Sequence, residues 1–135
     1  MNRKPYQLGQ AFRAACELIA LFSAIRDYLA DDAPIRFAFV RELLQAIRKV
    51  TGRFPLEFRI PETSEPSEVW VSHPNEIQTR KEIIRQIESV LPFLHQFVER
   101  HISTPQTTAI YHAGSLVKAH AAFCLIERMV QSHAS

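Results

Sequence analysis

The sequence predicts an all-α protein, and three observations support that prediction. Of the 135 residues, 47% are hydrophobic and only three are glycine, a composition typical of a helical globule. Apolar residues recur every three to four positions through four long segments, as they do on the buried stripe of a helix. Prolines and turn-forming residues gather between those segments. We therefore expect residues 1–135 to form a single four-helix bundle, with a long excursion between its second and third helices.

The first predicted helix runs from Tyr6 to Leu29, and its opening is echoed near the other end of the chain. Both places fit Tyr-x-x-Gly-x-x-[Phe/Val]-[Arg/Lys]-Ala, starting at Tyr6 and at Tyr111. Glycine inside a helix costs about 1 kcal/mol relative to alanine. We therefore expect Gly9 and Gly114 to sit where a neighbouring backbone approaches closely. The inward residues of this helix should be Leu8, Phe12, Ala15, Leu18, Ile19, Leu21, Phe22, Ile25 and Tyr28.

The second predicted helix runs from Ile35 to Val50. Asp32 can cap its start, since an aspartate accepts hydrogen bonds from free amides there, and Pro34 is tolerated in a first turn. Gly52 is the expected terminator. Its inward face should hold Phe39, Leu43, Ile47 and Val50.

Residues 53–72 change pattern and form the predicted excursion. Phe54, Leu56, Phe58 and Ile60 alternate with other residues between prolines, which is typical of a short exposed hairpin. An acidic, turn-rich run follows and ends at Trp70 between two valines.

The third predicted helix runs from about Pro74 to His101, and Pro92 inside it predicts a kink or a break into two helices. Ser103 and Gln106 have capping-box spacing and should open the fourth helix. The inward residues should be Ile77, Ile84, Ile87, Leu91, Leu94 and Val98 in the third helix, and Tyr111, Leu116, Phe123, Ile126, Met129 and Val130 in the fourth.

No motif predicts catalysis, a metal, a cofactor or a small-molecule ligand, so we do not expect an enzyme. The six histidines include no His-x-x-x-His or Glu-x-x-His pair, and the two cysteines form no Cys-x-x-Cys. One lesser alternative remains. Arg128 and His133 have the Arg-x4-His spacing seen in HEPN-type ribonucleases, although the pair lies near the chain end, where helices fray. Without an apolar run of membrane-spanning length or a secretory signal, and with two lone cysteines, we expect a cytoplasmic protein.

Charge is distributed unevenly along the chain. Residues 1–54 hold nine Lys or Arg against five Asp or Glu, whereas residues 55–70 hold one against four. On the second helix, a stripe opposite the apolar face is continued by one arginine just beyond it; together they are Arg41, Gln45, Arg48, Lys49 and Arg53. The three helical cations lack a carboxylate three or four residues away, unlike Arg13 with Glu17 and Arg85 with Glu88. Such cations suit a phosphate backbone, the alternative being an ordinary solvated face.

Two short motifs resemble a known family. Tyr6-Gln-Leu-Gly9-x-x-Phe12 and Ile25-Arg26-Asp27-Tyr28 resemble the helical C-terminal region of the type I-C CRISPR large subunit, which in such systems also exists as the separate small subunit of the Cascade complex. The resemblance implies a non-catalytic helical subunit of an antiviral-defence ribonucleoprotein. Its partners would be the other subunits of the effector complex together with guide RNA or single-stranded DNA. It would have no membrane partner.

A second hypothesis makes the chain a protein-only adaptor. In it, the acidic excursion 55–71 docks on a partner protein through Trp70, an aromatic anchor of the kind that dominates many interfaces. The alternative for Trp70 is a loop side chain folded onto its own bundle.

Overall fold

A computed structural model describes residues 8–55, 58, 75–103 and 112–133. Within those ranges the chain forms four α helices and no strand: α1 (Leu8–Leu29), α2 (Phe37–Thr51), α3 (Glu76–Ser103) and α5 (His112–Gln131). The predicted all-α bundle is confirmed. Tyr6, Tyr111 and Trp70 lie outside the described residues, as does most of the span in which a hairpin was expected.

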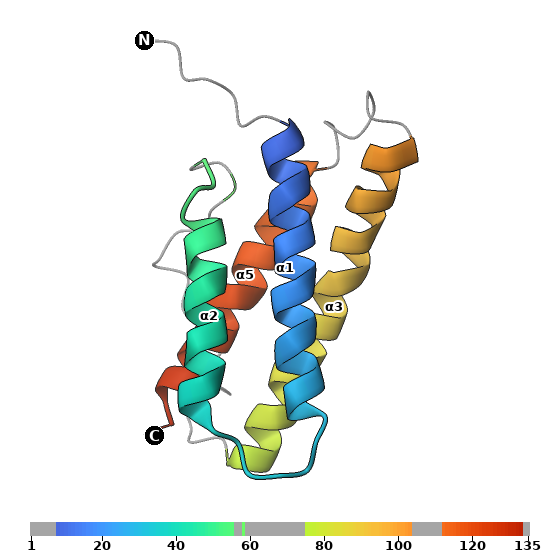
Figure 1. Cartoon of the computed structure of the whole chain (residues 1–135). Coiled ribbons are helices and arrows are strands. Elements are labelled where there is room, and N and C mark those ends of the chain that lie inside the picture. The colour runs from blue at the N-terminus through green and yellow to red at the C-terminus, as the bar shows by residue number, and fades with distance from the viewer. Residues whose placement is uncertain (1–7, 56–57, 59–74, 104–111, 134–135) are drawn as a thin grey trace.

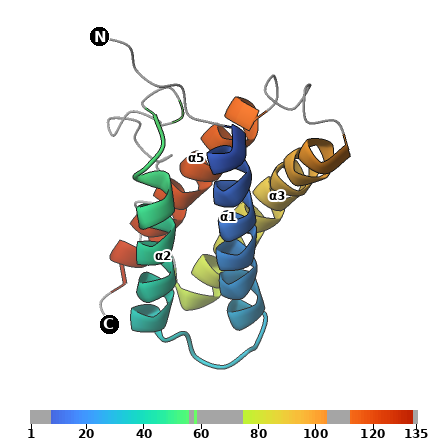
Figure 2. The same ribbon diagram turned by 45° about the horizontal axis from the view of Figure 1, so that its top comes forward.

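The four helices form a bundle in which α1 and α5 run antiparallel to α2 and α3. Figure 1 shows α1 and α5 descending while α2 and α3 rise, and α1 and α5 each pack against both α2 and α3. The view in Figure 2 shows α2 and α3 on opposite sides of the bundle. These two helices are parallel, so the end of α2 and the start of α3 lie at opposite ends of the bundle. This geometry accounts for the long connection predicted there.

The core lies between all four helices. The prediction for the last helix is confirmed, since Leu116, Phe123, Ile126, Met129 and Val130 are all buried. The largest fully buried side chains are Phe22, Phe97, Leu18, Ile25, Leu29, Ile47, Ile83, Ile87, Leu94, Leu116, Ile126 and Met129.

Two helices are rotated relative to the prediction. In α2 the buried residues include Phe37, Val40 and Leu44, whereas Phe39 is 42% exposed. In α3, Ile83 is buried instead of Ile84, which lies at the margin, and Ile77 is 65% exposed. The apolar arc of each helix is wider than its buried face, so periodicity alone does not decide which edge of the arc meets the core.

The turn between α1 and α2 is held by side chains from elsewhere and not by Asp32, which was expected to cap the second helix. The helix begins at Phe37, and the Ile35 amide donates a 2.7 Å hydrogen bond to Glu76 at the start of α3. Arg80, one turn further along α3, donates to the carbonyl oxygens of Leu29 (2.6 Å), Asp31 and Ala33. The start of α3 therefore fixes the end of α1 and the turn that follows it.

Pro92, Ser103 and the two helical glycines carry three further local predictions. α3 continues through Pro92, so the predicted break into two helices is wrong, whereas a kink there stays a prediction. Pro92 is exposed, and the carbonyl that loses its amide partner belongs to the exposed Glu88, where water can replace the bond. Ser103 is the last residue of α3, and residues 104–111, over which it was expected to open the next helix, lie outside the described residues. A Cβ at Gly9 or Gly114 would meet no atom of the described residues within 4 Å, so the described part of the chain brings no backbone close to either glycine.

The beginning of the predicted excursion is anchored to the bundle. Phe54 and Phe58 are 2% and 8% exposed, and their rings meet edge to face with centroids 6.2 Å apart. The Phe58 amide donates a 2.9 Å hydrogen bond to the Pro55 carbonyl, which closes a turn. The first part of the alternating pattern therefore marks buried aromatic anchors and not an exposed strand.

Candidate nucleic-acid interface

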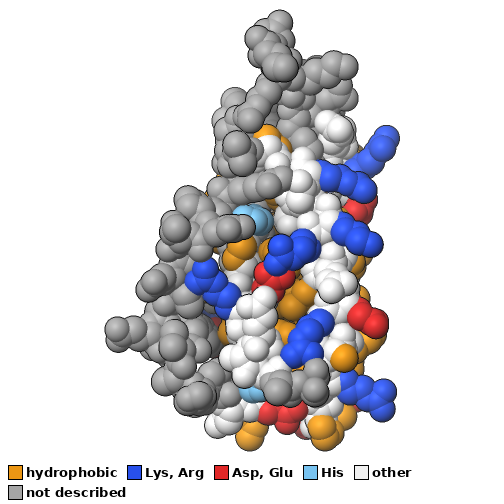
Figure 3. All heavy atoms as spheres, turned by 90° about the vertical axis from the view of Figure 1, so that its left-hand side faces the viewer, with side chains coloured by type: hydrophobic (Ala, Val, Ile, Leu, Met, Phe, Trp, Pro, Cys, Tyr) orange, Lys and Arg blue, Asp and Glu red, His pale blue; other side chains and the backbone are white. Residues whose placement is uncertain are grey.

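The predicted basic stripe lies on the outer face of α2. Figure 3 looks at this side of the molecule and shows Lys and Arg side chains spread over it with carboxylates among them, without a continuous basic patch. Gln45, Arg48, Lys49 and Arg53 are exposed, and Arg41 is half-buried. The structure divides the four cations into two groups: Arg41 and Arg48 contact residues near the end of the chain, and Lys49 and Arg53 line a hollow between α1 and α2.

Arg48 belongs to the first group because it links α2 to α5. Its Nε donates a 3.2 Å hydrogen bond to one carboxylate oxygen of Glu127, and its Nη2 forms an ion pair with the other. The guanidinium carbon also lies 5.6 Å from the centre of the Phe123 ring, within cation–π range. The expectation that Arg48 lacks a carboxylate holds only within its own helix. A partner 79 residues away supplies it.

Arg41 is held at the C-terminal end of the described chain. Its Nη2 donates a 2.5 Å hydrogen bond to the backbone oxygen of His133. The His133 ring stacks on Phe37 with centroids 4.4 Å apart and planes 8° from parallel, and its Nε2 lies 2.8 Å from the hydroxyl of buried Thr79. His133 therefore contributes to packing at this end of the bundle, where the sequence predicted fraying. The same contacts engage the imidazole of the Arg128–His133 pair considered for ribonuclease chemistry.

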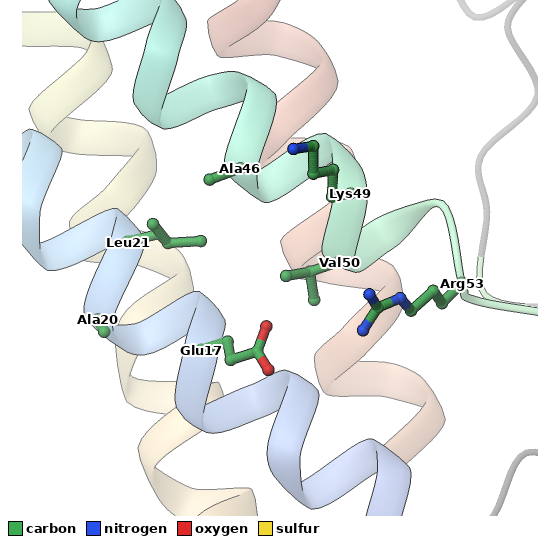
Figure 4. Close-up of a pocket in the computed structure, with 7 residues that line it drawn as sticks. All are labelled: Glu17, Ala20, Leu21, Ala46, Lys49, Val50 and Arg53. Carbon is green, nitrogen blue, oxygen red and sulfur yellow. The ribbon is translucent and has the colours of Figure 1, made fainter.

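Lys49 and Arg53 belong to the second group and line a hollow between α1 and α2. The hollow has a volume of about 430 Å³, and its walls include Ala20, Leu21 and Val50. Figure 4 shows Leu21 and Val50 pointing into it from the two helices, with Glu17 and Arg53 directed toward each other from opposite sides. The hollow thus combines apolar walls with a charged rim.

An adjoining hollow of about 320 Å³ adds Arg13 to this site. It is lined by Gln10, Arg13, Ala14, Glu17, Val50 and Arg53, and it shares the last three with the first hollow. We call the two hollows together the α1–α2 groove. Three exposed cations, Arg13, Lys49 and Arg53, surround one carboxylate, Glu17. Arg13 was not expected to bind phosphate, because Glu17, one turn along the same helix, was expected to pair with it.

A third hollow lies on the other side of α2, against α5. It has a volume of about 290 Å³ and is lined by Arg41, Leu44, Gln45, Arg48, Lys49, Glu127, Val130 and Gln131. Here Glu127 compensates the charge of Arg48. Each of the two sites therefore has three cations and one carboxylate, but in the third hollow Arg41 and Arg48 are held by His133 and Glu127. Lys49 stands between the two sites.

Two ionisable groups away from the stripe are perturbed by their neighbours. Partial burial raises the pKa of the Cys16 thiol, and the negative charge of Glu17 raises it further. Arg85 pairs with Glu82, three residues before it, where the sequence pointed to Glu88. The hydrogen bond that Arg85 donates to Glu82, together with the negative charge of that carboxylate, raises the pKa of Arg85. Arg85 is therefore an exposed arginine with a local partner outside the groove.

The residues that the structure describes contain no group of three or more His, Cys, Asp or Glu side chains placed to hold a metal ion. None of the helices among them is long and apolar enough to cross a membrane. Comparisons with protein-family models, curated proteins and solved structures found no match for this chain.

Proposed function

We propose that this chain is a non-catalytic helical subunit of a CRISPR-type ribonucleoprotein, which contacts the phosphate backbone of guide RNA or target DNA and stabilises the assembled complex. The observation that supports the proposal best is the cluster of Arg13, Lys49 and Arg53 around the α1–α2 groove. The type of complex comes from the resemblance of the Tyr6 and Ile25 motifs to the Cascade small subunit. A cytoplasmic location and partner subunits belong to the same proposal.

The chemistry of the groove suits a phosphate backbone. An arginine guanidinium presents a planar fork of donors that matches two phosphate oxygens, and a lysine ammonium adds a mobile point charge. The cations come from two different helices, so consecutive phosphates of one strand can reach both walls. The Lys- and Arg-rich first part of the chain, residues 1–54, supplies all three of them.

The test is a salt titration of binding to a fluorescein-labelled single-stranded RNA of about 20 nucleotides, followed by anisotropy. Lys49→Ala and Arg53→Ala should each weaken binding and reduce the slope of log K against log salt by about 0.7, the value per phosphate contact on a single strand. Arg85→Ala is the matched control, since that arginine pairs with Glu82 away from the groove, and it should leave the slope unchanged.

Equal losses for all three variants would indicate a diffuse positive field and contradict a groove site. Absence of salt-dependent binding in the unmodified protein would reject the proposal and favour the adaptor hypothesis. That hypothesis has its own assay. Blue-shifted, quencher-protected fluorescence of Trp70, the only tryptophan, in the isolated protein would argue against docking through it.

A further inference from the structure

Glu17 is an unexpected residue to find in a groove that binds a polyanion. It lines both hollows of the α1–α2 groove, and its carboxylate points into the space between the helices, facing Arg53 (Figure 4). A carboxylate repels phosphate and offers only hydrogen-bond acceptors. The Glu17 carboxylate therefore suits a ligand that brings hydrogen-bond donors into the groove along with its phosphates.

We propose that the α1–α2 groove takes an unpaired guanine base of a single strand, with Glu17 accepting hydrogen bonds from its Watson–Crick edge while Lys49 and Arg53 contact the flanking phosphates. This inference rests on the proposed function and specifies its ligand. Sequence-specific RNA recognition commonly reads the edges of unstacked single-stranded bases in this way.

Guanine is the base whose edge matches a carboxylate. Its N1–H and N2–H donors lie side by side and can meet the two oxygens of Glu17 together. On the same edge, adenine and cytosine each place one amino donor beside an acceptor nitrogen, and uracil places its single donor between two carbonyl oxygens. In a duplex this edge is already paired, so the carboxylate also favours single strands.

The walls of the groove suit the faces of a base. Ala20, Leu21, Ala46 and Val50 provide an apolar surface, and the two alanines leave room where longer side chains would fill the space. The larger hollow, at about 430 Å³, falls in the range of sites that hold small organic ligands, roughly 300–1,000 Å³. Such a space accommodates one base and excludes a double helix.

The experiment uses fluorescein-labelled RNA 9-mers of uridine that differ only in the central base, measured by anisotropy with the full chain. We expect a central guanosine to bind about tenfold more tightly than uridine, adenosine or cytidine, consistent with the discrimination of a bidentate contact. Inosine keeps N1–H but lacks the N2 amine, so it should retain only part of that preference. Pairing the guanosine 9-mer with its complement should abolish it.

Three variants test the role of Glu17 against a simple charge effect. Glu17→Gln should tighten binding of all-uridine RNA, since a negative charge is lost, and should remove the guanosine preference. Glu42→Gln removes one exposed charge of α2 that lines none of the three hollows, and it should keep the preference. Ala20→Leu, which fills the groove, should also remove the preference while leaving the salt slope intact. Circular dichroism confirms that each variant is folded.

The outcomes separate the two proposals. If Glu17→Gln tightens every 9-mer equally and the unmodified protein shows no base preference, Glu17 only adjusts charge; the guanine site is then rejected while the phosphate-binding function stands. If no 9-mer binds, or if polyglutamate competes as well as RNA, the proposed function fails as well. A guanosine preference that survives in Glu17→Gln would place the reading group elsewhere and overturn the inference.

Discussion

Replacing Arg48 by alanine should destabilise the fold, although this side chain is 60% exposed. The substitution removes the ion pair with Glu127, whose side chain is only 22% exposed, and the contact with the Phe123 ring. Exposed ion pairs contribute about 0.2–1 kcal/mol, and exposed cation–π contacts about 0.5–1 kcal/mol. We therefore expect a loss of about 1 kcal/mol, which lowers the melting temperature of a chain of this length by roughly 3–4 °C.

Urea unfolding followed by circular dichroism measures this loss, and a double-mutant cycle isolates the pair. Arg48→Ala, Glu127→Ala and the double variant should give a coupling energy of about 0.5–1 kcal/mol, which shrinks in 1 M NaCl, where charges are screened beyond about 3 Å. Lys49→Ala is the adjacent control and should change stability by less than about 0.5 kcal/mol. Equal stability of Arg48→Ala and Lys49→Ala, or a coupling energy of zero, would refute the interhelical link.

Three further outcomes are expected. Gly9→Ala and Gly114→Ala should each stabilise the protein by about 0.5 kcal/mol in urea unfolding, because each glycine lies in a helix where an added Cβ would meet no described atom within 4 Å. A loss of stability would mean that a neighbour needs that space. Arg80→Ala should lower the free energy of unfolding by about 2 kcal/mol, because three backbone carbonyls lose a charged donor, and Arg80→Lys should lower it by a smaller amount. A melting temperature of Arg80→Ala equal to that of the unmodified protein would contradict this. Cys16 should react slowly with iodoacetamide at pH 8, because its raised pKa keeps the thiol protonated at a pH where an ordinary cysteine is partly ionised. Glu17→Gln should lower that pKa and speed the reaction a few-fold. An unchanged rate would show that Glu17 does not raise the pKa.

The helices could be predicted from the sequence because apolar periodicity is a local property. The last helix is the clearest case, since the residues from Leu116 to Val130 that were expected inside are buried. The rotation of α2 could not be predicted, because Phe37 and Phe39 are equally apolar and the choice between them depends on neighbouring helices. The same limit applies to charge. Local spacing shows that Arg48 has no carboxylate on its own helix, but only the folded chain brings Glu127 to it.

Part of the groove could be predicted from the sequence. Lys49 and Arg53 were expected to contact phosphate from their position on the basic stripe, and both line the groove. Arg13 was set aside because a local partner was available, and the apolar walls have no sequence signature, since small and branched residues on two helices form them only after packing. Grooves between helices depend on interhelical geometry, which short motifs do not encode.

The turn that joins α1 to α2 also has a mechanical consequence for the groove. The two helices that form the groove are connected through this turn, and Glu76 and Arg80 of α3 form hydrogen bonds with backbone groups at its two ends. α3 therefore fixes one end of the helix pair that forms the groove, and the spacing of α1 and α2 depends on residues that no ligand in the groove would touch. A partner protein that displaced the first turn of α3 would break these hydrogen bonds and so change the spacing of α1 and α2 from a distance.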